Sequence, residues 1–438
     1  MKNRSTVSFY TLGCRANQYE SDAIAEELER RGFSVVPFGE CADVAVINTC
    51  SVTGESDRKS RQMIRRALTN SYAENVIVTG CSAQIFKEEI EAISGNFIIV
   101  GNAEKNSIPD LAESFVSGRC PTGGVSDIFL APYDGMTISH ARRARAFVKI
   151  EDGCENRCAY CIIPKGRGKV RSKNEDDIIA EVTNIAKSCP EIILTGIETA
   201  SYGRDRGERD ALERLLVKVN AIDGVERLTL GSLDPNILTD GFLTSTASLP
   251  SFLPHLHVSV QSGSSTVLAR MRRRYNAEQL LEKLTRTREI IPGIMLTADV
   301  IVGFPGESEE EFLETVDFIK EIGFMHLHIF PYSKRRGTEA ATMPGQLSHQ
   351  IKHERAKRLS EIQKEIKRQI LEDYIDQYRD GGDEVLFEQK QRGVNIGHSR
   401  HYIEVRVPSE DDFSDRVVPV RLTRTDGEVV FGEQILNC

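Results

Sequence analysis

The sequence predicts an α/β protein in three parts: a doubly wound parallel sheet at the N-terminal end, a partial (βα)6 barrel in the middle, and a small all-β module at the C-terminal end. In the first two parts, short apolar strand patterns alternate with helical patterns, an order typical of parallel sheets. In the last part, apolar and polar residues alternate with a period of two, which is typical of antiparallel strands. With 438 residues, the chain is long enough for two or three domains.

The first part, residues 1–130, contains four apolar strand patterns. They lie at residues 6–13, 43–49, 75–80 and 97–101. Helical patterns separate them, and the first helix is expected from about Gln18 to Gly32, a residue type that often ends helices. This alternation predicts the doubly wound parallel sheet.

Three cysteines follow the first three of these strands directly: Cys14, Cys50 and Cys81. The carboxyl ends of parallel strands lie along one edge of a sheet, which is where such folds bind their ligands. We therefore expect the three thiols to meet at a single site.

The second part, residues 140–372, follows a loop-rich connection at about 119–143. Its six strand patterns lie at residues 145–152, 191–197, 225–232, 255–262, 295–304 and 326–333. Six strand–helix units predict a partial barrel, whose functional residues should lie at the C-terminal ends of the strands.

The third part, residues 376–438, is preceded by a charged amphipathic helix at 347–378. Its strand patterns lie at residues 384–389, 401–408, 416–424 and 427–435. They predict a small barrel-like module of a type that often binds nucleic acid.

Composition and charge restrict the class of protein. The formal net charge of −9 argues against a generally basic nucleic-acid-binding surface, although basic runs occur at 270–275, 333–336 and 352–368. A single run of this kind is more often a solvated face than a binding site. No apolar run approaches the roughly 18–20 residues of a membrane span, and the opening stretch has no signal-peptide core. We expect a cytoplasmic protein.

The segment CENRCAYC at 154–161 places Cys154, Cys158 and Cys161 in one loop after the first barrel strand, with no fourth cysteine nearby. Ten cysteines in this chain are too few for a disulfide scaffold, so clustered ones favour metal binding or catalysis. Both a structural zinc ion and an iron–sulfur cluster normally take four ligands. With three thiolates, one iron of a cluster keeps an open position for a cofactor or substrate.

This loop resembles that of radical S-adenosylmethionine (SAM) enzymes. The resemblance implies a [4Fe-4S] cluster on the three thiolates, with the amino and carboxylate groups of SAM on the fourth iron. Cleavage of SAM would yield methionine and a 5′-deoxyadenosyl radical.

Nearly the whole chain also resembles the methylthiotransferase family. The segments that carry the resemblance are TLGCRANQYESD (11–22), VINTCSVT (46–53), VTGCSAQ (78–84), RAFVKIEDGCENRCAYCIIPKGRGKVRS (145–172), ILTGIETASYG (193–203), VSVQSGSSTVLARMRRRY (258–275) and TADVIVGFPGESEEEF (297–312). The resemblance implies a methylthiotransferase N-terminal domain at 1–130, a radical SAM domain at 140–372, and an RNA-binding module called TRAM at 376–438.

The resemblance also implies a second cluster. In that family the N-terminal trio, here Cys14, Cys50 and Cys81, holds an auxiliary [4Fe-4S] cluster that can carry an extra sulfur atom. One SAM methylates that sulfur and a second SAM generates the radical. Catalytic residues beyond the six cluster ligands are not predicted.

Further positions follow from the resemblance by their place in the motifs. The expected SAM contacts are Tyr160, Thr195, Gly196, Ser259, Gln261 and Gly303. Arg167 and Arg171, which follow the cluster loop, are expected to bind a SAM carboxylate or an RNA phosphate. Lys334 and Arg335 are expected to contact RNA.

The segment TLGCRANQYES resembles the MtaB-like group, which converts N6-threonylcarbamoyladenosine at position 37 of tRNA to its 2-methylthio derivative. The expected partners are the tRNA anticodon arm, an electron donor such as flavodoxin or ferredoxin, and a sulfur source. Two alternatives in the same class are a methylthiotransferase for N6-isopentenyladenosine of tRNA and one for an aspartate of a ribosomal protein. A more remote alternative is a non-catalytic RNA-binding protein with zinc.

Overall fold

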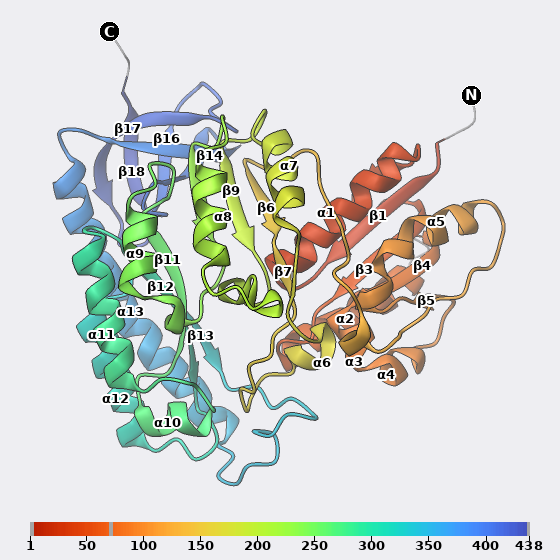
Figure 1. Ribbon diagram of the computed structural model, residues 1–438, viewed down its shortest axis with the longest axis horizontal. Helices are drawn as coiled ribbons and strands as arrows, with labels where there is room; N and C mark the ends of the chain where they lie inside the picture. Colours follow the sequence, from red (N-terminus) through yellow and green to blue (C-terminus); the bar gives the residue numbers. More distant parts are fainter. Residues whose placement is uncertain (1–3, 70–72, 436–438) are drawn as a thin grey trace.

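The computed structural model describes residues 4–69 and 73–435, which form the three predicted regions (Figure 1). Among these residues, no helix is both long enough and apolar enough to cross a membrane.

The N-terminal region is a parallel sheet with the strand order β2-β1-β3-β4-β5, which confirms the doubly wound prediction. Its strands are β1 (Thr6–Thr11), β2 (Ser34–Val36), β3 (Ala42–Thr49), β4 (Ala73–Gly80) and β5 (Ile98–Ile99). Its helices are α1 (Arg15–Arg30), α2 (Gly54–Thr69), α3 (Cys81–Ile85), α4 (Lys87–Glu91) and α5 (Ile108–Val116). The short edge strand β2 was not predicted, and α1 begins three residues before the expected Gln18.

Alternate residues of β3 face the two sides of this sheet. Val44 and Val46 pack with Ile24 of α1, whereas Ala45 and Ile47 pack in the separate cluster that contains the core residues of α2. The period of two in a strand therefore gives each face of the sheet its own layer of helices.

The middle region is a partial barrel of six parallel strands in two hydrogen-bonded halves, β6-β9-β10 and β11-β12-β13. The strands are β6 (Arg145–Lys149), β9 (Glu191–Thr195), β10 (Arg227–Leu230), β11 (His255–Gln261), β12 (Met295–Val302) and β13 (His326–Pro331). The helices are α6 (Ile163–Arg167), α7 (Glu175–Ile185), α8 (Ala211–Asn220), α9 (Asp240–Ala247), α10 (Ser265–Arg270), α11 (Ala277–Ile290) and α12 (Glu309–Ile322). A two-stranded pair, β7 (Glu151–Asp152) and β8 (Arg171–Ser172), flanks the cluster loop and α6.

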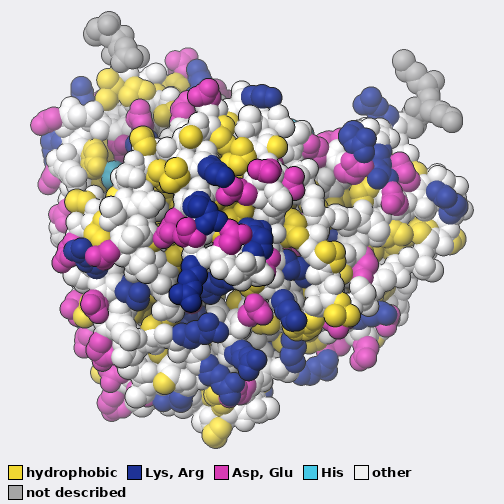
Figure 2. Space-filling view, viewed as in Figure 1, with side chains coloured by type: hydrophobic (Ala, Val, Ile, Leu, Met, Phe, Trp, Pro, Cys, Tyr) yellow, Lys and Arg dark blue, Asp and Glu magenta, His cyan; other side chains and the backbone are white. Residues whose placement is uncertain are grey.

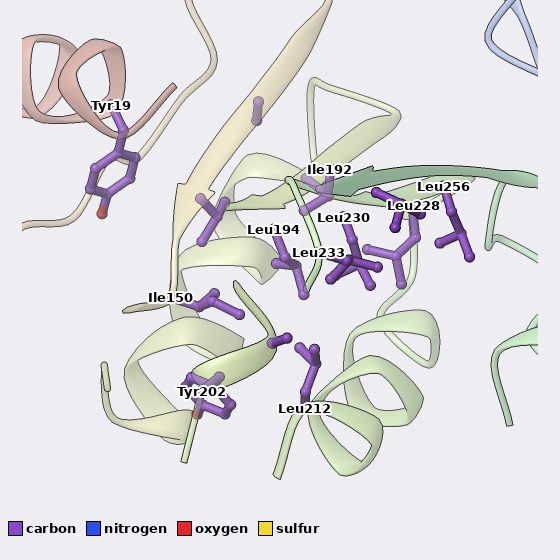
Figure 3. Packing of buried hydrophobic residues seen from close by; sticks show 14 of the residues in the cluster. Tyr19, Ile150, Ile192, Leu194, Tyr202, Leu212, Leu228, Leu230, Leu233 and Leu256 are labelled. Carbon is purple, nitrogen blue, oxygen red and sulfur yellow. The ribbon is translucent and has the colours of Figure 1, made fainter. Parts of the chain in front are cut away.

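The outward faces of the barrel strands form the main core. In Figure 3, Leu194 of β9 and Leu230 of β10 point toward Leu212 of α8, and all three are buried. Tyr19 of α1 belongs to the same core, so a continuous apolar cluster joins the N-terminal sheet to the barrel.

The C-terminal region is a closed barrel with the strand order β14-β15-β16-β18-β17, reached through the long helix α13 (His349–Tyr378). Its strands are β14 (Asp383–Gln391), β15 (Val394–Ser399), β16 (Glu404–Pro408), β17 (Val417–Thr425) and β18 (Val430–Gln434). β15 was not predicted, because its sequence VNIGHS is weakly apolar and contains Gly397. The glycine is required there: a Cβ at position 397 would lie 2.7 Å from Cα of Phe387 in β14.

This C-terminal barrel covers the N-terminal ends of the middle strands. Arg227, at the start of β10, donates to the Ser399 carbonyl at 2.9 Å and pairs with Glu191 at 2.7 Å. His255, at the start of β11, stacks on Tyr402 with ring centroids 4.5 Å apart. The module is therefore part of the structure around the barrel rather than a loosely attached appendage.

Replacing Arg227 by Leu should destabilise the protein by about 3 kcal/mol, because it leaves the buried Glu191 carboxylate without its closest cation. The apparent melting temperature should fall by about 5 °C or more. The control is Arg286→Leu, which removes an exposed pair with Asp240 and should cost less than about 1 kcal/mol. Equal melting temperatures for both variants would contradict the importance of the Arg227 contacts.

Candidate cofactor and substrate site

Three of the six clustered cysteines follow a glycine with a positive φ angle. Gly13, Gly80 and Gly153 have φ values of 102°, 97° and 96° and precede Cys14, Cys81 and Cys154. At position 80, a Cβ would lie 2.5 Å from the Thr49 nitrogen and 2.6 Å from Asn48 Oδ1. Glycine alone allows this backbone direction, so each strand can turn sharply and place a thiol at its end.

The N-terminal trio lies at the carboxyl edge of the sheet, after β1, β3 and β4, as expected. Cys14 caps α1 and Cys81 begins α3. Burial, together with the nearby Cys81 and Cys14 thiols, raises the pKa of Cys50 to about 11. Electrostatic influence of this kind requires the three thiols to lie close together.

The second trio lies in the loop after β6 and β7. Burial raises the pKa of Cys161 to about 12, with further contributions from Cys158 of its own trio and from Cys81 of the other. A Cβ on Gly166 of α6 would lie 3.4 Å from Cys81 Cβ, so α6 carries the second trio up against the first. The two trios therefore face one another across the boundary between sheet and barrel.

The spacing of the thiols fits a cluster better than a single ion. Within the described residues, neither trio brings its three sulfur atoms within 4.8 Å of one another. Thiolates on one zinc ion lie closer together than this, because each sits about 2.3 Å from the metal. A four-iron cluster is larger than one ion and holds its thiolates further apart, and two separate trios of thiols offer the donors that two such clusters need.

Arg167 does not lie on the surface, which corrects the expectation that it could bind an RNA phosphate. Its side chain is completely buried. Nε donates to Cys81 Sγ at 3.3 Å, and the other guanidinium nitrogens bind Glu20, Asn17 and Asp152. This barrel residue instead links the cluster loop to a thiol of the N-terminal trio.

Arg335 is also buried and forms an ion pair with Asp57 of α2 at 2.5 Å, so the expected RNA contact is wrong for this side chain. Arg171 is mostly buried and donates to the Ile128 carbonyl at 3.1 Å, next to Asp152. Lys334 is exposed.

Sequence reasoning missed the role of Arg273, which lies in the basic run 270–275. Arg273 Nη1 donates to Cys158 Sγ at 3.3 Å, and Nη2 pairs with Asp234 at 2.9 Å. Each thiol trio thus has one sulfur that accepts a hydrogen bond from an arginine side chain that is at least largely buried. A run of four arginines in five residues gives no indication of which one points inward.

Glu198, after β9, was also missed. Burial raises the pKa of Glu198 to about 7, with Asp234 contributing. Its carboxylate accepts from Asn156 of the cluster loop at 3.5 Å. Glu198 belongs to no recognisable motif of acidic residues, so the sequence alone does not indicate its role.

The expected SAM contacts are distributed around the barrel. Thr195 and Gly196 line the large cavity described below. The Ser259 hydroxyl is hydrogen-bonded at 2.8 Å to the hydroxyl of Ser232, which lines the cavity. Gln261 is buried with a φ of 68° at the end of β11.

The remaining two expected SAM contacts, Tyr160 and Gly303, lie elsewhere. Tyr160 packs against the cluster that contains Ala159, Phe304 and Ala340. Gly303 lies against Lys352 of α13, and its N–H donates a hydrogen bond to Glu307 at 2.6 Å. Neither lines the cavity. The structure thus brings Thr195, Gly196 and Ser259 together near Cys14.

A cavity of about 710 Å³ runs from Cys14 through the inside of the barrel to the C-terminal module. It is lined by residues of all three regions: Gly13, Cys14, Arg15, Thr195, Gly196, Ser232, His255, His257, Thr297, Asp299, Met325, His326, His328, Phe330, Lys367, Leu371, His398, Tyr402, Ile403, Glu404 and Glu428. Strand alternation explains its polarity. In β11, Leu256 and Val258 join the core, so His255 and His257 face inward. The volume lies within the usual range for small-molecule sites.

Comparison with known proteins agrees with this arrangement. Residues 6–101 match an uncharacterized protein family, UPF0004, and residues 148–319 match the radical SAM superfamily. A solved structure of the radical SAM methyltransferase TsrM from Kitasatospora setae, with cobalamin and a [4Fe-4S] cluster bound, aligns with a TM-score of 0.56. It shares 15% identity, and the alignment covers 77% of each chain, so the likeness concerns the fold. Fold and site thus define a radical SAM protein with an additional N-terminal cysteine trio.

Two curated relatives are similar over almost their whole length. The threonylcarbamoyladenosine tRNA methylthiotransferase MtaB of Bacillus subtilis is 38% identical over 96% of this chain and 94% of its own. The tRNA-2-methylthio-N(6)-dimethylallyladenosine synthase of Moorella thermoacetica is 34% identical over 99% of each. The chain belongs to the MtaB-like methylthiotransferase family.

Gly80→Ala should remove the N-terminal cluster and leave the second one. The new Cβ would collide with the backbone of Thr49, so Cys81 could not keep its position. Iron in anaerobically prepared protein should fall from roughly eight to roughly four atoms per chain. The control is Gly32→Ala, which has a similar φ of 92° but no atom within 4 Å of the new Cβ, and should keep its iron. Full iron content in Gly80→Ala would show that this turn does not position a ligand.

Proposed function

We propose that this protein is a tRNA methylthiotransferase that adds a methylthio group to C2 of N6-threonylcarbamoyladenosine at position 37. The observation that carries the proposal is the closeness of two three-thiol sites, of which the first borders, through Cys14, a cavity with the volume of a small-molecule site. The name and extensive similarity of the Bacillus subtilis relative support the choice of substrate.

In this proposal Cys154, Cys158 and Cys161 hold one [4Fe-4S] cluster together with SAM, and Cys14, Cys50 and Cys81 hold the auxiliary cluster. When bound, these groups supply the one-electron chemistry and the sulfur atom that insertion at an unreactive C–H bond requires. Thr195, Gly196, Ser259 and Gln261 are the proposed SAM contacts near the cavity, with Tyr160 and Gly303 further along the barrel.

The protein's own contribution is positioning. Arg167 and Arg273 each donate a hydrogen bond to one sulfur of a trio and so help to fix the position of that sulfur. Hydrogen bonds to cluster sulfur also affect the reduction potential. Because Arg167 comes from the barrel and Cys81 from the sheet, the same bond fixes the distance between the two sites.

The RNA would approach the mouth of the barrel, where exposed cations surround the cluster loop. Arg157, Lys165, Lys334 and Arg336 are exposed, and Lys165 Nζ lies close to Gly337. Figure 2 shows Lys and Arg side chains gathered across the lower middle of the face shown. These cations could neutralise phosphates despite the negative net charge of the chain. Arg171 is too enclosed to take part without a rearrangement.

The similarity to the Moorella thermoacetica relative favours dimethylallyladenosine as the second candidate substrate. A cytoplasmic location, an electron donor such as flavodoxin or ferredoxin, and a sulfur source complete the proposal.

Replacing Lys334 and Arg336 together by Ala should weaken binding of an anticodon stem-loop RNA. Because salt dependence counts neutralised phosphates, the slope of log K against log [salt] should become shallower by about 0.7–0.9 for each lost contact. The control is Arg30→Ala, an exposed arginine of α1 far along the helix from the cysteines. An unchanged slope in the double variant would assign RNA binding to other residues.

The function is tested by mass spectrometry of tRNA nucleosides from cells with and without the gene. Deletion should abolish 2-methylthio-N6-threonylcarbamoyladenosine and accumulate its precursor. The gene should restore the nucleoside, whereas Cys14→Ala or Cys158→Ala genes should not. Loss of the methylthio-dimethylallyl nucleoside instead would assign the second substrate, and no change in either would redirect the search to a ribosomal protein.

A further inference from the structure

Arg15 is the one charged residue of the cavity lining that forms no ion pair among the residues the structure describes. The other charged lining residues each have a polar partner: Lys367 pairs with Glu428 at 3.2 Å, Glu404 pairs with Arg406 at 2.7 Å, and Asp299 lies 3.3 Å from the His257 imidazole. A guanidinium group without an anionic partner, half-buried in a cavity, leaves a site for an anion of the ligand.

The position of Arg15 places this charge between the cysteines and the barrel interior. It directly follows Cys14 and is the first residue of α1. The guanidinium carbon lies 5.6 Å from the centre of the Phe147 ring of β6. It also lies near His255 and His328, since burial and the charge of Arg15 both lower the pKa of these imidazoles. Phe147 supports one side of the Arg15 guanidinium, whose N–H groups donate no hydrogen bond within the part of the chain that the structure describes.

The cavity wall beside Arg15 is polar but carries little positive charge. The Thr297 hydroxyl bonds to His255 at 3.0 Å and to His257 at 2.9 Å. Ligand atoms of His257, Asp299 and His328 lie within 4.8 Å of one another, a spacing that could also suit a metal ion. We call His257, Asp299 and His328 the His257–Asp299 row. The permanent positive charge of Arg15 next to His328 opposes binding of a metal cation there, so the row is better suited to hydroxyl and urea groups.

We propose that Arg15 binds the carboxylate of the threonylcarbamoyl group and thereby selects this substrate over a dimethylallyl one. The inference rests on the proposed function. A threonylcarbamoyl group ends in a carboxylate and carries a hydroxyl and a urea, which match Arg15 and the His257–Asp299 row. Arginine can bind a carboxylate through two parallel hydrogen bonds. A dimethylallyl group is a hydrocarbon and would remove water from Arg15 without replacing it, which a polar site penalises strongly.

The test uses fluorescence anisotropy with the intact, cluster-loaded protein and three anticodon stem-loop RNAs. They carry at position 37 either threonylcarbamoyladenosine, its neutral carboxamide analogue, or unmodified adenosine. The wild-type protein should bind the carboxylate RNA about 10- to 100-fold more tightly than the carboxamide RNA, as expected for a charged hydrogen bond. Arg15→Gln should bind both with nearly the same affinity, and Arg15→Lys should keep part of the preference.

Controls separate this effect from damage to the neighbouring cluster ligand. Iron content is measured for every variant, and Arg15→Met serves as a second neutral variant if Arg15→Gln loses iron. Arg30→Gln makes the same change at the exposed far end of α1 and should behave as wild type. The proposal is overturned if wild type shows no preference for the carboxylate or if Arg15→Gln retains it.

A turnover assay distinguishes failure of the Arg15 inference from failure of the proposed function on which it rests. If wild type methylthiolates threonylcarbamoyladenosine RNA but Arg15→Gln discriminates normally, the Arg15 inference fails and the function stands. If wild type acts only on dimethylallyladenosine RNA, the proposed function and the inference both fail.

Discussion

A buried network of charges at the boundary between the N-terminal sheet and the barrel determines where both thiol sites lie. Glu20 of α1 accepts from Lys105, Lys149 and Arg167, and Asp152 pairs with Arg167 at 3.1 Å. Although burial opposes it, these cations hold the pKa of Glu20 well below its usual range. Buried ions are tolerated only when each has its partners in good geometry. The sheet and the barrel therefore cannot shift against one another without exposing unpaired charges to the protein interior.

Because the buried ion pairs hold the sheet and the barrel in one orientation, few hydrogen bonds are needed to align the two thiol sites. Arg167 occupies the centre of the network and also donates to Cys81, so the geometry of the ion pairs is transmitted directly to a cluster ligand. The continuous core through Tyr19 supports the same orientation by packing. The folded chain itself therefore fixes how the two thiol sites lie relative to one another. The ion pairs permit one arrangement of sheet and barrel, and the apolar core stabilises that arrangement.

The parts that could be predicted from the sequence are those with a local pattern. Strand–helix alternation identified both parallel sheets, and the position of Cys14, Cys50 and Cys81 after successive strands predicted that they would meet. Arg167 was misassigned because its partner Glu20 lies 147 residues earlier, and a charged residue between two glycines gives no sign of such a contact. The prediction for Arg335 was wrong for the same reason, because its partner Asp57 lies 278 residues away in the sequence. β15 was missed because the close approach of β14 requires a glycine where strand propensity would favour a branched residue.

The shared cavity limits how independent the three regions can be. His398, Tyr402 and Ile403 of the C-terminal barrel form one wall of the space that Cys14 borders at the other end. A module exchanged between relatives would bring its own side chains into this wall, in addition to its outer surface. Recombination at the end of α13 would therefore alter the lining of the cavity together with the outer surface of the module.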